Sequence, residues 1–319
     1  MRESPKSMVL AGVDIGTLTC RLLIARVGAE GRLSELHAQR QVLRLGEGLA
    51  RGGRLKPAAM ARVIATLARW RRIIETYQVD GEAVVATSAV REATNREEFL
   101  AKAKQEAGFS VEVISGEEEA RRTMLGIRSG LPKGVSAILG LDIGGGSTEF
   151  ILDRPNRPPV IRSIEIGVVR LTEQALLHDP PTAEEIARAS EAVVVAADSV
   201  RPVLGDLHGT TFVGAAGTIT TLAAMALGLS AYEGARIHNY RLELETVRRL
   251  ERELLSRSKA QRRGTPGLEA GREDVIAAGT LILRGVMERL GYEACLVSDL
   301  GLREGIVLDL AVRLRERDQ

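Results

Sequence analysis

Two stretches of the sequence, VDIGTLTCRL and LDIGGGSTEF, share one pattern, in which an apolar run ends in Asp-Ile-Gly and a short turn of small or hydroxyl residues follows. Asp14 and Gly16 hold the places in the first copy that Asp142 and Gly144 hold in the second. The interval between the copies has the size of a small domain. An internal repeat of this length predicts two similar domains.

Apolar runs typical of strands alternate with segments of helical periodicity, which predicts mixed α/β layers. MVLAGVDI, CRLLIARVG and ELHAQRQVLRL are typical of three successive strands in an antiparallel start, and residues 56–79 repeat apolar residues at helical spacing. A strand AVVATSAV, a helix over 95–108 closed by glycine, and a strand SVEVIS follow. These elements make up one expected α/β domain.

After SAILGLDI the same order begins again, with the strands EFILD and PVIRSIEI and a helix over 182–200. We therefore expect a first α/β domain over residues 1–125 and a second over 126–302. A C-terminal helix over 303–319 can pack back on the first domain. The boundary is expected inside or just after the helix that begins near Glu117.

Composition excludes several classes of partner. The chain has 319 residues, of which 45% are hydrophobic and 27% charged, which is typical of globular domains. A net charge of +2 indicates no nucleic-acid or membrane partner, so anion recognition is expected to be local. Cys20 and Cys295 have no metal-site spacing and indicate a reducing compartment. With no membrane-length apolar run and no signal-peptide pattern, we expect a cytoplasmic protein.

The glycine turns can be interpreted in two ways. A turn of glycines and hydroxyls after a buried strand can place several backbone N–H groups on one concave surface, which suits phosphate. No Walker pattern is present, so the positive charge must come from arginines or a metal, and Asp14 and Asp142 are candidate Mg²⁺-directed carboxylates. The alternative is a plain β-hairpin whose aspartate satisfies turn amides. The presence of two such turns favours phosphate.

Three consecutive glutamates begin a helix in VISGEEEARRTML. Ser115 and Glu118 fit a capping box, in which Glu118 returns to the backbone N–H at the start of the helix. Glu117 suits the positive end of the helix dipole. Glu119 is left over, and is a candidate to orient and deprotonate a water molecule. Taken alone, it could equally be another surface glutamate that complements the dipole.

A further anion candidate is VVATSAVREATN, where Thr87, Ser88 and Arg91 follow the end of a strand. Arginine suits planar, bidentate recognition of phosphate. The alternative is a surface arginine beside a helix cap.

The ordered motifs DIGTLT, RLGEGL, ATSAVREATN, ISGEEEAR, DIGGGSTEF, IGVVRL, VGAAGTITTLAA, PGLEAGREDVIAAG and SDLGLREG resemble the exopolyphosphatase/guanosine pentaphosphate phosphohydrolase (Ppx/GppA) family. The resemblance runs from about residue 10 to about residue 310. It implies two duplicated actin-like ATPase (ribonuclease H-like) α/β domains around a central cleft. It also implies Mg²⁺-dependent hydrolysis of a terminal phosphoanhydride, optionally with a monovalent cation. The implied substrates are inorganic polyphosphate and the 5′-triphosphate end of guanosine pentaphosphate.

By position, the resemblance assigns Glu119 as the catalytic glutamate and Glu149 as a second functional carboxylate. It assigns phosphate-binding roles to residues of both glycine turns and to two arginines: Gly16, Thr17, Thr19, Arg44, Arg91, Gly144, Gly145 and Ser147. Asp14 and Asp142 fall at the metal-directed positions of the same two turns.

The sequence departs from this family at Leu18, where the first turn usually carries asparagine. Either a phosphate contact is lost, or backbone amides and Thr19 replace it. The chain also resembles the short, two-domain form of the family, for which processive hydrolysis of long chains is not expected.

Two other functions remain open from the sequence. One is a sugar or acid kinase of the same superfamily, with VGAAGTITTLAA as an adenosine-side loop, although no acceptor-sugar signature is recognisable. The other is a phosphate or alarmone sensor made inert by Leu18. Aromatic residues make up only 3% of the chain, which favours polyphosphate over a nucleotide. A homodimer is the default expectation for oligomeric state.

Overall fold

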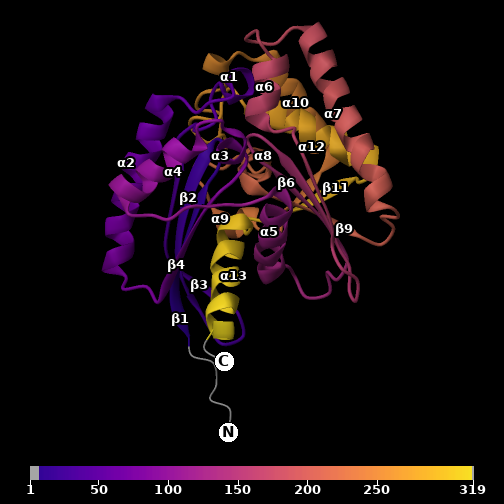
Figure 1. Ribbon diagram of the computed structural model, residues 1–319. Helices are drawn as coiled ribbons and strands as arrows, with labels where there is room; N and C mark the ends of the chain where they lie inside the picture. The colour runs from indigo at the N-terminus through magenta and orange to yellow at the C-terminus, as the bar shows by residue number, and fades with distance from the viewer. Residues whose placement is uncertain (1–6, 318–319) are drawn as a thin grey trace. The chain divides into compact units, whose positions relative to one another are not determined.

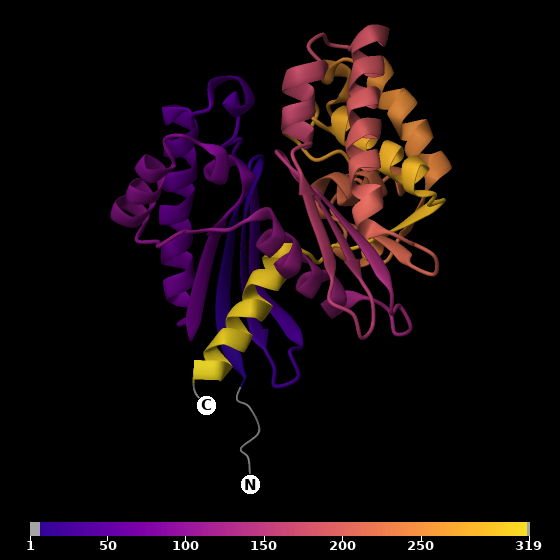
Figure 2. The ribbon, with the colours of Figure 1, turned by 45° about the vertical axis from the view of Figure 1, so that its right-hand side comes forward.

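The computed structural model describes residues 7–317, which form two compact units (Figures 1 and 2). The first unit runs to Ser129 and takes in the C-terminal segment from Leu300. The second unit is the continuous segment Gly130–Asp299. Within the described residues no helix is both long and apolar enough to cross a membrane.

The first unit contains a mixed sheet in the order β3-β2-β1-β4-β5, antiparallel across β1, β2 and β3 and parallel across β1, β4 and β5. Its strands are β1 (Met8–Ile15), β2 (Thr19–Val27), β3 (Leu33–Val42), β4 (Gly81–Ala86) and β5 (Glu112–Val113). Its helices are α1 (Leu49–Gly52), α2 (Pro57–Thr76), α3 (Ser88–Glu92), α4 (Arg96–Ala107), α5 (Gly116–Gly130) and α13 (Leu302–Arg317). The last residue of α5, Gly130, begins the second unit.

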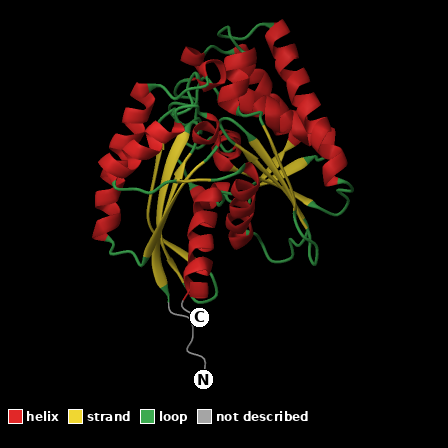
Figure 3. Ribbon diagram, in the orientation of Figure 1, coloured by secondary structure: helices red, strands yellow, loops and turns green. Residues whose placement is uncertain are grey.

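Helices cover both faces of this sheet (Figure 3). On one face, Leu22 and Ile24 of β2 pack in the core that Trp70 of α2 and Phe99 of α4 share. On the other face, alternate residues of the same strand pack against Val307, Leu310 and Ala311 of α13. Because both faces are covered, β1 and β2 read as nearly continuous apolar runs rather than alternating ones.

The second unit contains a mixed sheet in the order β10-β11-β9-β6-β7-β8. Its strands are β6 (Ile138–Ile143), β7 (Thr148–Asp153), β8 (Val160–Ile164), β9 (Thr211–Ala215), β10 (Arg241–Glu243) and β11 (Ala294–Val297). Its helices are α6 (Val168–Ala175), α7 (Ala183–Leu204), α8 (Ala216–Ala226), α9 (Gly234–Ile237), α10 (Leu244–Ser256), α11 (Lys259–Arg262) and α12 (Ile276–Leu290). Helix α12 is buried along most of its length, because α6, α7, α8 and α10 all pack against it.

The two sheets repeat one topology. Read in corresponding directions, β3-β2-β1-β4-β5 of the first unit matches β8-β7-β6-β9-β11 of the second, and β10 is an added edge strand. In each unit the first two strands form an antiparallel hairpin, β1–β2 or β6–β7. The first strand of each hairpin also pairs in parallel with a strand that comes later in the chain, β4 or β9. The duplicated α/β fold predicted from the repeated turns is therefore confirmed.

Two of the predicted strands are shorter than expected. The strand predicted over AVVATSAV ends at Ala86, and Ser88 already begins α3. The strand predicted over SVEVIS pairs only at Glu112–Val113. Apolar runs of this length are compatible with strand or helix. Here the Thr87 N–H donates to the Ile15 carbonyl at 3.2 Å, and the chain turns directly after it.

Candidate active site

The first glycine turn connects β1 and β2 as a tight hairpin. The Gly16 N–H donates to the Thr19 carbonyl at 3.0 Å. A Cβ atom at residue 16 would lie 2.8 Å from that same carbonyl oxygen, so the close approach requires glycine. The hairpin interpretation of this turn is thus correct as a description of its backbone.

The backbone N–H groups at the centre of this turn have no hydrogen-bond acceptor among the described residues. The amides of Thr17 and Leu18 donate no hydrogen bond to any residue between 7 and 317. Native proteins rarely leave such groups without a partner, so these two amides call for a ligand or water. A hairpin and an anion-binding turn are therefore compatible here.

The segment that carries Arg44 is bonded to the first turn. The N–H groups of Leu43 and Arg44 both donate to the Leu18 carbonyl at 2.9 Å, and the Gly46 N–H donates to the Thr17 carbonyl at 2.9 Å. Arg44 adopts a left-handed backbone conformation, with φ of 54°. A non-glycine residue held there costs free energy, and such positions cluster at functional sites.

Asp14 lies buried at the end of β1, directly before the first turn. Its cross-strand neighbour in β2 is Arg21, whose Nη1 atom lies 3.5 Å from Asp14 Oδ2. Arg21 is not among the predicted site residues. Its position opposite Asp14 follows from the hairpin register.

Glu119 and Arg91, predicted separately as catalytic base and phosphate ligand, contact each other. Arg91 Nη1 donates to Glu119 Oε2 at 3.3 Å and to the Ile114 carbonyl at 2.9 Å. Glu119 lies in the first turn of α5 and is only 8% exposed. The guanidinium of Arg91 therefore restrains the carboxylate of Glu119, and the two residues form one group.

Glu118 differs from its predicted role. The Ser115 hydroxyl accepts a hydrogen bond from the Glu118 N–H at 3.1 Å, which is half of the expected capping box. The Glu118 carboxylate, however, accepts from Arg121 at 2.7 Å and from Arg122 at 2.6 Å. The hydrogen bond from Arg121 is the main cause that lowers the pKa of Glu118 to about 2. Two arginines compete better for this carboxylate than one neutral backbone N–H.

The second glycine turn connects β6 and β7 with the same hydrogen bond as the first. The Gly144 N–H donates to the Ser147 carbonyl at 3.0 Å. The amides of Gly145 and Gly146, which correspond to Thr17 and Leu18, donate no hydrogen bond within the described chain. Both copies of the repeat thus leave the same pair of amides available.

The first turn of α6 holds the carbonyl side of this second turn. Val168 and Val169 donate their N–H groups to Gly144 and Gly145 at 3.0 and 2.9 Å, and Arg170 Nε donates to the Gly146 carbonyl at 3.0 Å. Because the carbonyls are engaged, the groups that remain are N–H donors. The motif IGVVRL contains these residues, but their role could not be inferred without the tertiary contact.

Asp142 and Glu149 face each other across the β6–β7 pair. Both are buried, and the Ser163 hydroxyl donates to Glu149 Oε1 at 2.7 Å. In the first unit the corresponding pair is Asp14 and Arg21, a carboxylate and a guanidinium cation. Two carboxylates directly opposite in a sheet repel each other, so a cation suits the second pair more than the first.

Metal binding by protein side chains alone is not indicated. No group of three or more His, Cys, Asp or Glu side chains within residues 7–317 could hold a metal ion. Mg²⁺ is commonly held by one or two carboxylates together with water and substrate phosphates. Asp142 and Glu149, buried beside a turn with free amides, fit that pattern.

The loop VGAAGTITTLAA forms the β9–α8 connection of the second unit. Ala216 adopts φ of 68°, and the space beside Gly217 holds the guanidinium of Arg272, which is buried and paired with Glu269 at 2.5 Å. A Cβ atom at residue 217 would lie 2.2 Å from Arg272 Nη2. This arginine was not among the predicted site residues.

Comparison with known proteins points to one family. The sequence profile of the Ppx/GppA phosphatase family matches residues 23–314. Exopolyphosphatase 2 of Mycobacterium tuberculosis is 35% identical over 317 residues, which covers 95% of this chain and 98% of that protein. The crystal structure of an exopolyphosphatase-like protein is similar with a TM-score of 0.91 at 32% identity, covering 98% of this chain and 100% of the other.

A crystal structure of the Aquifex aeolicus member of the family is similar with a TM-score of 0.81 at 31% identity, covering 98% of this chain and 100% of the other. The family profile and these relatives each span nearly the whole chain. The chain therefore belongs to the Ppx/GppA phosphatase family.

Proposed function

We propose that the protein is a phosphoanhydride hydrolase that releases the terminal phosphate of inorganic polyphosphate, of the 5′-triphosphate end of guanosine pentaphosphate, or of both. The observation that carries this proposal is the repeated pair of unused amides, Thr17 and Leu18 in one unit and Gly145 and Gly146 in the other. Backbone N–H groups gathered in a turn bind anions without side-chain charge. Each unit thus contains a turn that suits a phosphate group of such a substrate.

In the proposed reaction, Glu119 orients a water molecule and accepts its proton. The water oxygen forms a bond to the terminal phosphorus as the bridging P–O bond breaks, and the leaving phosphate keeps that electron pair. Arg91, in contact with Glu119 at 3.3 Å, holds the carboxylate in position. Catalysis of phosphoryl transfer consists mostly of positioning and charge neutralisation, which turn amides and arginines such as Arg44 supply.

We further propose that Mg²⁺ is the cofactor. In the second unit Asp142 and Glu149 would provide carboxylate ligands for it, directly or through water, and Asp14 is the metal-directed carboxylate of the first unit. When bound, the ion neutralises phosphate charge. The opposed carboxylates of Asp142 and Glu149 support the proposal, because a divalent cation relieves their repulsion. Activity should be lost in excess chelator and restored by added Mg²⁺.

Polyphosphate is the favoured substrate. The relative in Mycobacterium tuberculosis is named an exopolyphosphatase, and aromatic residues that could stack on a guanine base are scarce in this chain. The deciding experiment measures phosphate release from polyphosphate and from guanosine pentaphosphate in parallel, with purified protein. Turnover of the nucleotide alone would overturn the substrate preference.

The same assay separates the alternative functions. A superfamily kinase would consume ATP only when an acceptor sugar or acid is present. A sensor would bind polyphosphate without releasing phosphate. Phosphate release that is independent of any acceptor supports the hydrolase, and its absence with both substrates in the presence of Mg²⁺ would contradict it.

A further inference from the structure

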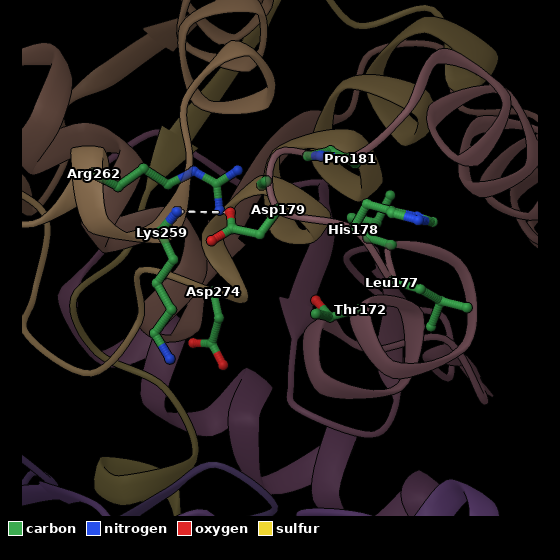
Figure 4. A pocket seen from close by; sticks show the side chains of 10 residues that line it. Thr172, Leu177, His178, Asp179, Pro181, Lys259, Arg262 and Asp274 are labelled. Carbon is green, nitrogen blue, oxygen red and sulfur yellow. Dashed lines mark hydrogen bonds between the residues drawn. The ribbon is translucent and has the colours of Figure 1, made fainter.

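The second unit contains a pocket of about 130 Å³ that none of the predicted site residues line. It lies where the segment after α6 meets α11 and the start of α12 (Figure 4). Arg262, Lys259 and Asp274 lie on one side, and Thr172, His178 and Pro181 on the other. One water molecule needs a cavity of only about 10–15 Å³, so this pocket has room for a small molecule.

Arg262 is a buried cation in the wall of this pocket. Its side chain is part of a residue that is 3% exposed, and its Nε and Nη1 atoms donate to the carbonyls of Leu254 and Glu273, each at 2.8 Å. Among the residues that the structure describes, Arg262 forms no ion pair, and Nη2 donates no hydrogen bond. Burial lowers the pKa of this guanidinium. The carboxylates of Asp179 and Asp274 partly offset this lowering of the pKa. A buried guanidinium with an unused N–H is nevertheless costly, so an oxyanion that accepts from Nη2 would be favourable.

The other charged groups define which anion fits. Lys259 adds a second cation, while Asp179 and Asp274 add two carboxylates. Asp179 is already engaged, because its Oδ1 atom accepts the Lys259 N–H at 2.7 Å. The two carboxylates repel a doubly charged anion more strongly than a singly charged one. With Arg262, the pocket carries two cations and two carboxylates, so a monoanion is opposed less than a doubly charged phosphate.

The remaining walls are apolar. Leu176 and Ala277 are buried, and Pro181 contributes a third apolar surface. Small-molecule sites typically combine such walls with a few polar groups that fix orientation. Among the described residues, Arg262 Nη2 and Lys259 Nζ have unused donor capacity, and of the two residues Arg262 is the buried one.

We propose that this pocket binds a small aliphatic monocarboxylate, whose carboxylate accepts a hydrogen bond from Arg262 Nη2 and whose hydrocarbon part packs against Leu176 and Ala277. This site is separate from the glycine turns and does not depend on the hydrolase proposal.

The test measures binding of sodium butyrate to the full chain by ligand-detected NMR and calorimetric titration, with butyramide as the uncharged ligand of the same shape. Butyrate should bind and butyramide should bind at least about 10-fold more weakly, because a hydrogen bond to a charged group is worth about 10- to 150-fold in affinity. Equal binding of the two ligands, or no butyrate binding, would overturn the proposal.

Two variants locate the binding. Lys259→Glu replaces a positive charge at the pocket with a negative one and should weaken butyrate binding by about 10-fold or more. Within the described residues the Lys259 side chain forms no hydrogen bond or ion pair, so the substitution breaks no such contact. Lys104→Glu makes the same charge change at an exposed position of α4 in the other unit and should leave butyrate affinity unchanged. Equal affinities in both variants would place butyrate elsewhere.

Arg262→Gln should abolish detectable butyrate binding, and the Lys259 variant keeps the proposal testable if that protein does not fold. Inorganic phosphate, titrated against bound butyrate, should not displace it at equal concentration. Displacement by phosphate would show that the pocket selects phosphate and would overturn the monocarboxylate assignment.

Discussion

Glu118 and Glu119 are adjacent in α5, but their carboxylates meet different partners. Glu118 pairs with Arg121 and Arg122 on the same helix, whereas Glu119 meets Arg91, which α3 presents. The direction in which each side chain leaves the helix decides this difference, since successive helical residues point to different faces. A role in chemistry is therefore expected for Glu119 alone.

Glu119→Gln should lower the turnover number by about 10²–10⁴-fold, because loss of a general base typically has that effect. Its thermal midpoint should stay close to that of the wild type. Glu118→Gln is the matched control, and should keep most of the turnover. Steady-state phosphate release on both variants checks this, and equal losses of turnover would contradict the assignment.

Leu18 bears on binding through its backbone rather than its side chain. The side chain is 4% exposed, and its unused group is the backbone N–H. Leu18→Asn should therefore lower the free energy of unfolding by about 1–3 kcal/mol, because a buried amide side chain would lack partners. Substrate affinity should not improve. Tighter substrate binding with an unchanged thermal midpoint would instead show that the leucine removes a phosphate contact.

The turn between β6 and β7 depends on its packing against the start of α6. A Cβ atom at Gly167 would lie 2.5 Å from the carbonyl carbon of Gly145. Real Cβ atoms do not approach backbone this closely, so Gly167→Ala must displace the turn that carries the free amides of Gly145 and Gly146. The local geometry of this element is thus set by a residue outside it.

Gly167→Ala should raise the KM for polyphosphate about 10-fold or more, since misplaced donors lose charge-assisted hydrogen bonds. Gly52→Ala is the matched control, because a Cβ atom at Gly52 meets nothing within 4 Å. Steady-state kinetics of both variants on polyphosphate measure the two KM values. A KM that changes equally in both would rule out a specific role for the turn.

Helices α5 and α13 are joined by an ion-pair group centred on Glu118. Arg121 bridges Glu118 and Asp309 of α13, with distances of 2.7 and 2.5 Å. The pKa of Glu118 is lowered from 4.5 to about 2, so this group stabilises the folded state above about pH 4.5. That contribution is lost as the pH falls from 4.5 toward 2.

The acid stability of the protein should therefore decline between about pH 4.5 and 2, and Glu118→Gln should flatten this part of the profile. Denaturant unfolding of both proteins at pH 7, 4 and 3 measures the effect. The difference in unfolding free energy between wild type and variant should shrink as the pH falls. A difference that grows toward low pH would contradict the depressed pKa.

The whole molecule is assembled from a discontinuous unit and a continuous one. The first unit needs α13, because Val307, Leu310 and Ala311 cover the face of the sheet formed by β1 and β2. The second unit, Gly130–Asp299, contains its own sheet and helices. The two units should therefore respond differently to truncation.

A chain that ends at Asp299 should lose the cooperative unfolding of the first unit and expose apolar strand surface. Limited proteolysis should then cut within β1 to β3, while the segment Gly130–Asp299 stays protected. Circular dichroism and proteolysis mapping check this. A truncated chain that unfolds as stably as the full protein would show that α13 is dispensable.

Much of the fold follows from local pattern. The repeated Asp-Ile-Gly turns predict duplication, and both appear as hairpin turns of two sheets with one topology. The family was also evident from the ordered motifs, and the comparisons confirm it. Strand ends were less predictable: in AVVATSAV only Thr87 and Ser88 are polar, and the strand stops at Ala86 because α3 begins at Ser88. The assigned roles of the site residues stay predictions.

The unused amides, the Arg91–Glu119 contact and the buried Arg262 depended on tertiary structure. A residue type states which hydrogen bonds a group can make, but its partners come from segments far apart in the chain. Within residues 7–317 the N–H groups of Thr17, Leu18, Gly145 and Gly146 donate no hydrogen bond, because the hairpins, together with the first turn of α6 in the second copy, engage their neighbours. The Glu118 carboxylate does not make its predicted capping contact, because Arg121 and Arg122 donate hydrogen bonds to it. Sequence periodicity records burial and turns, whereas the pairing of polar groups is settled only when the packed elements bring them together.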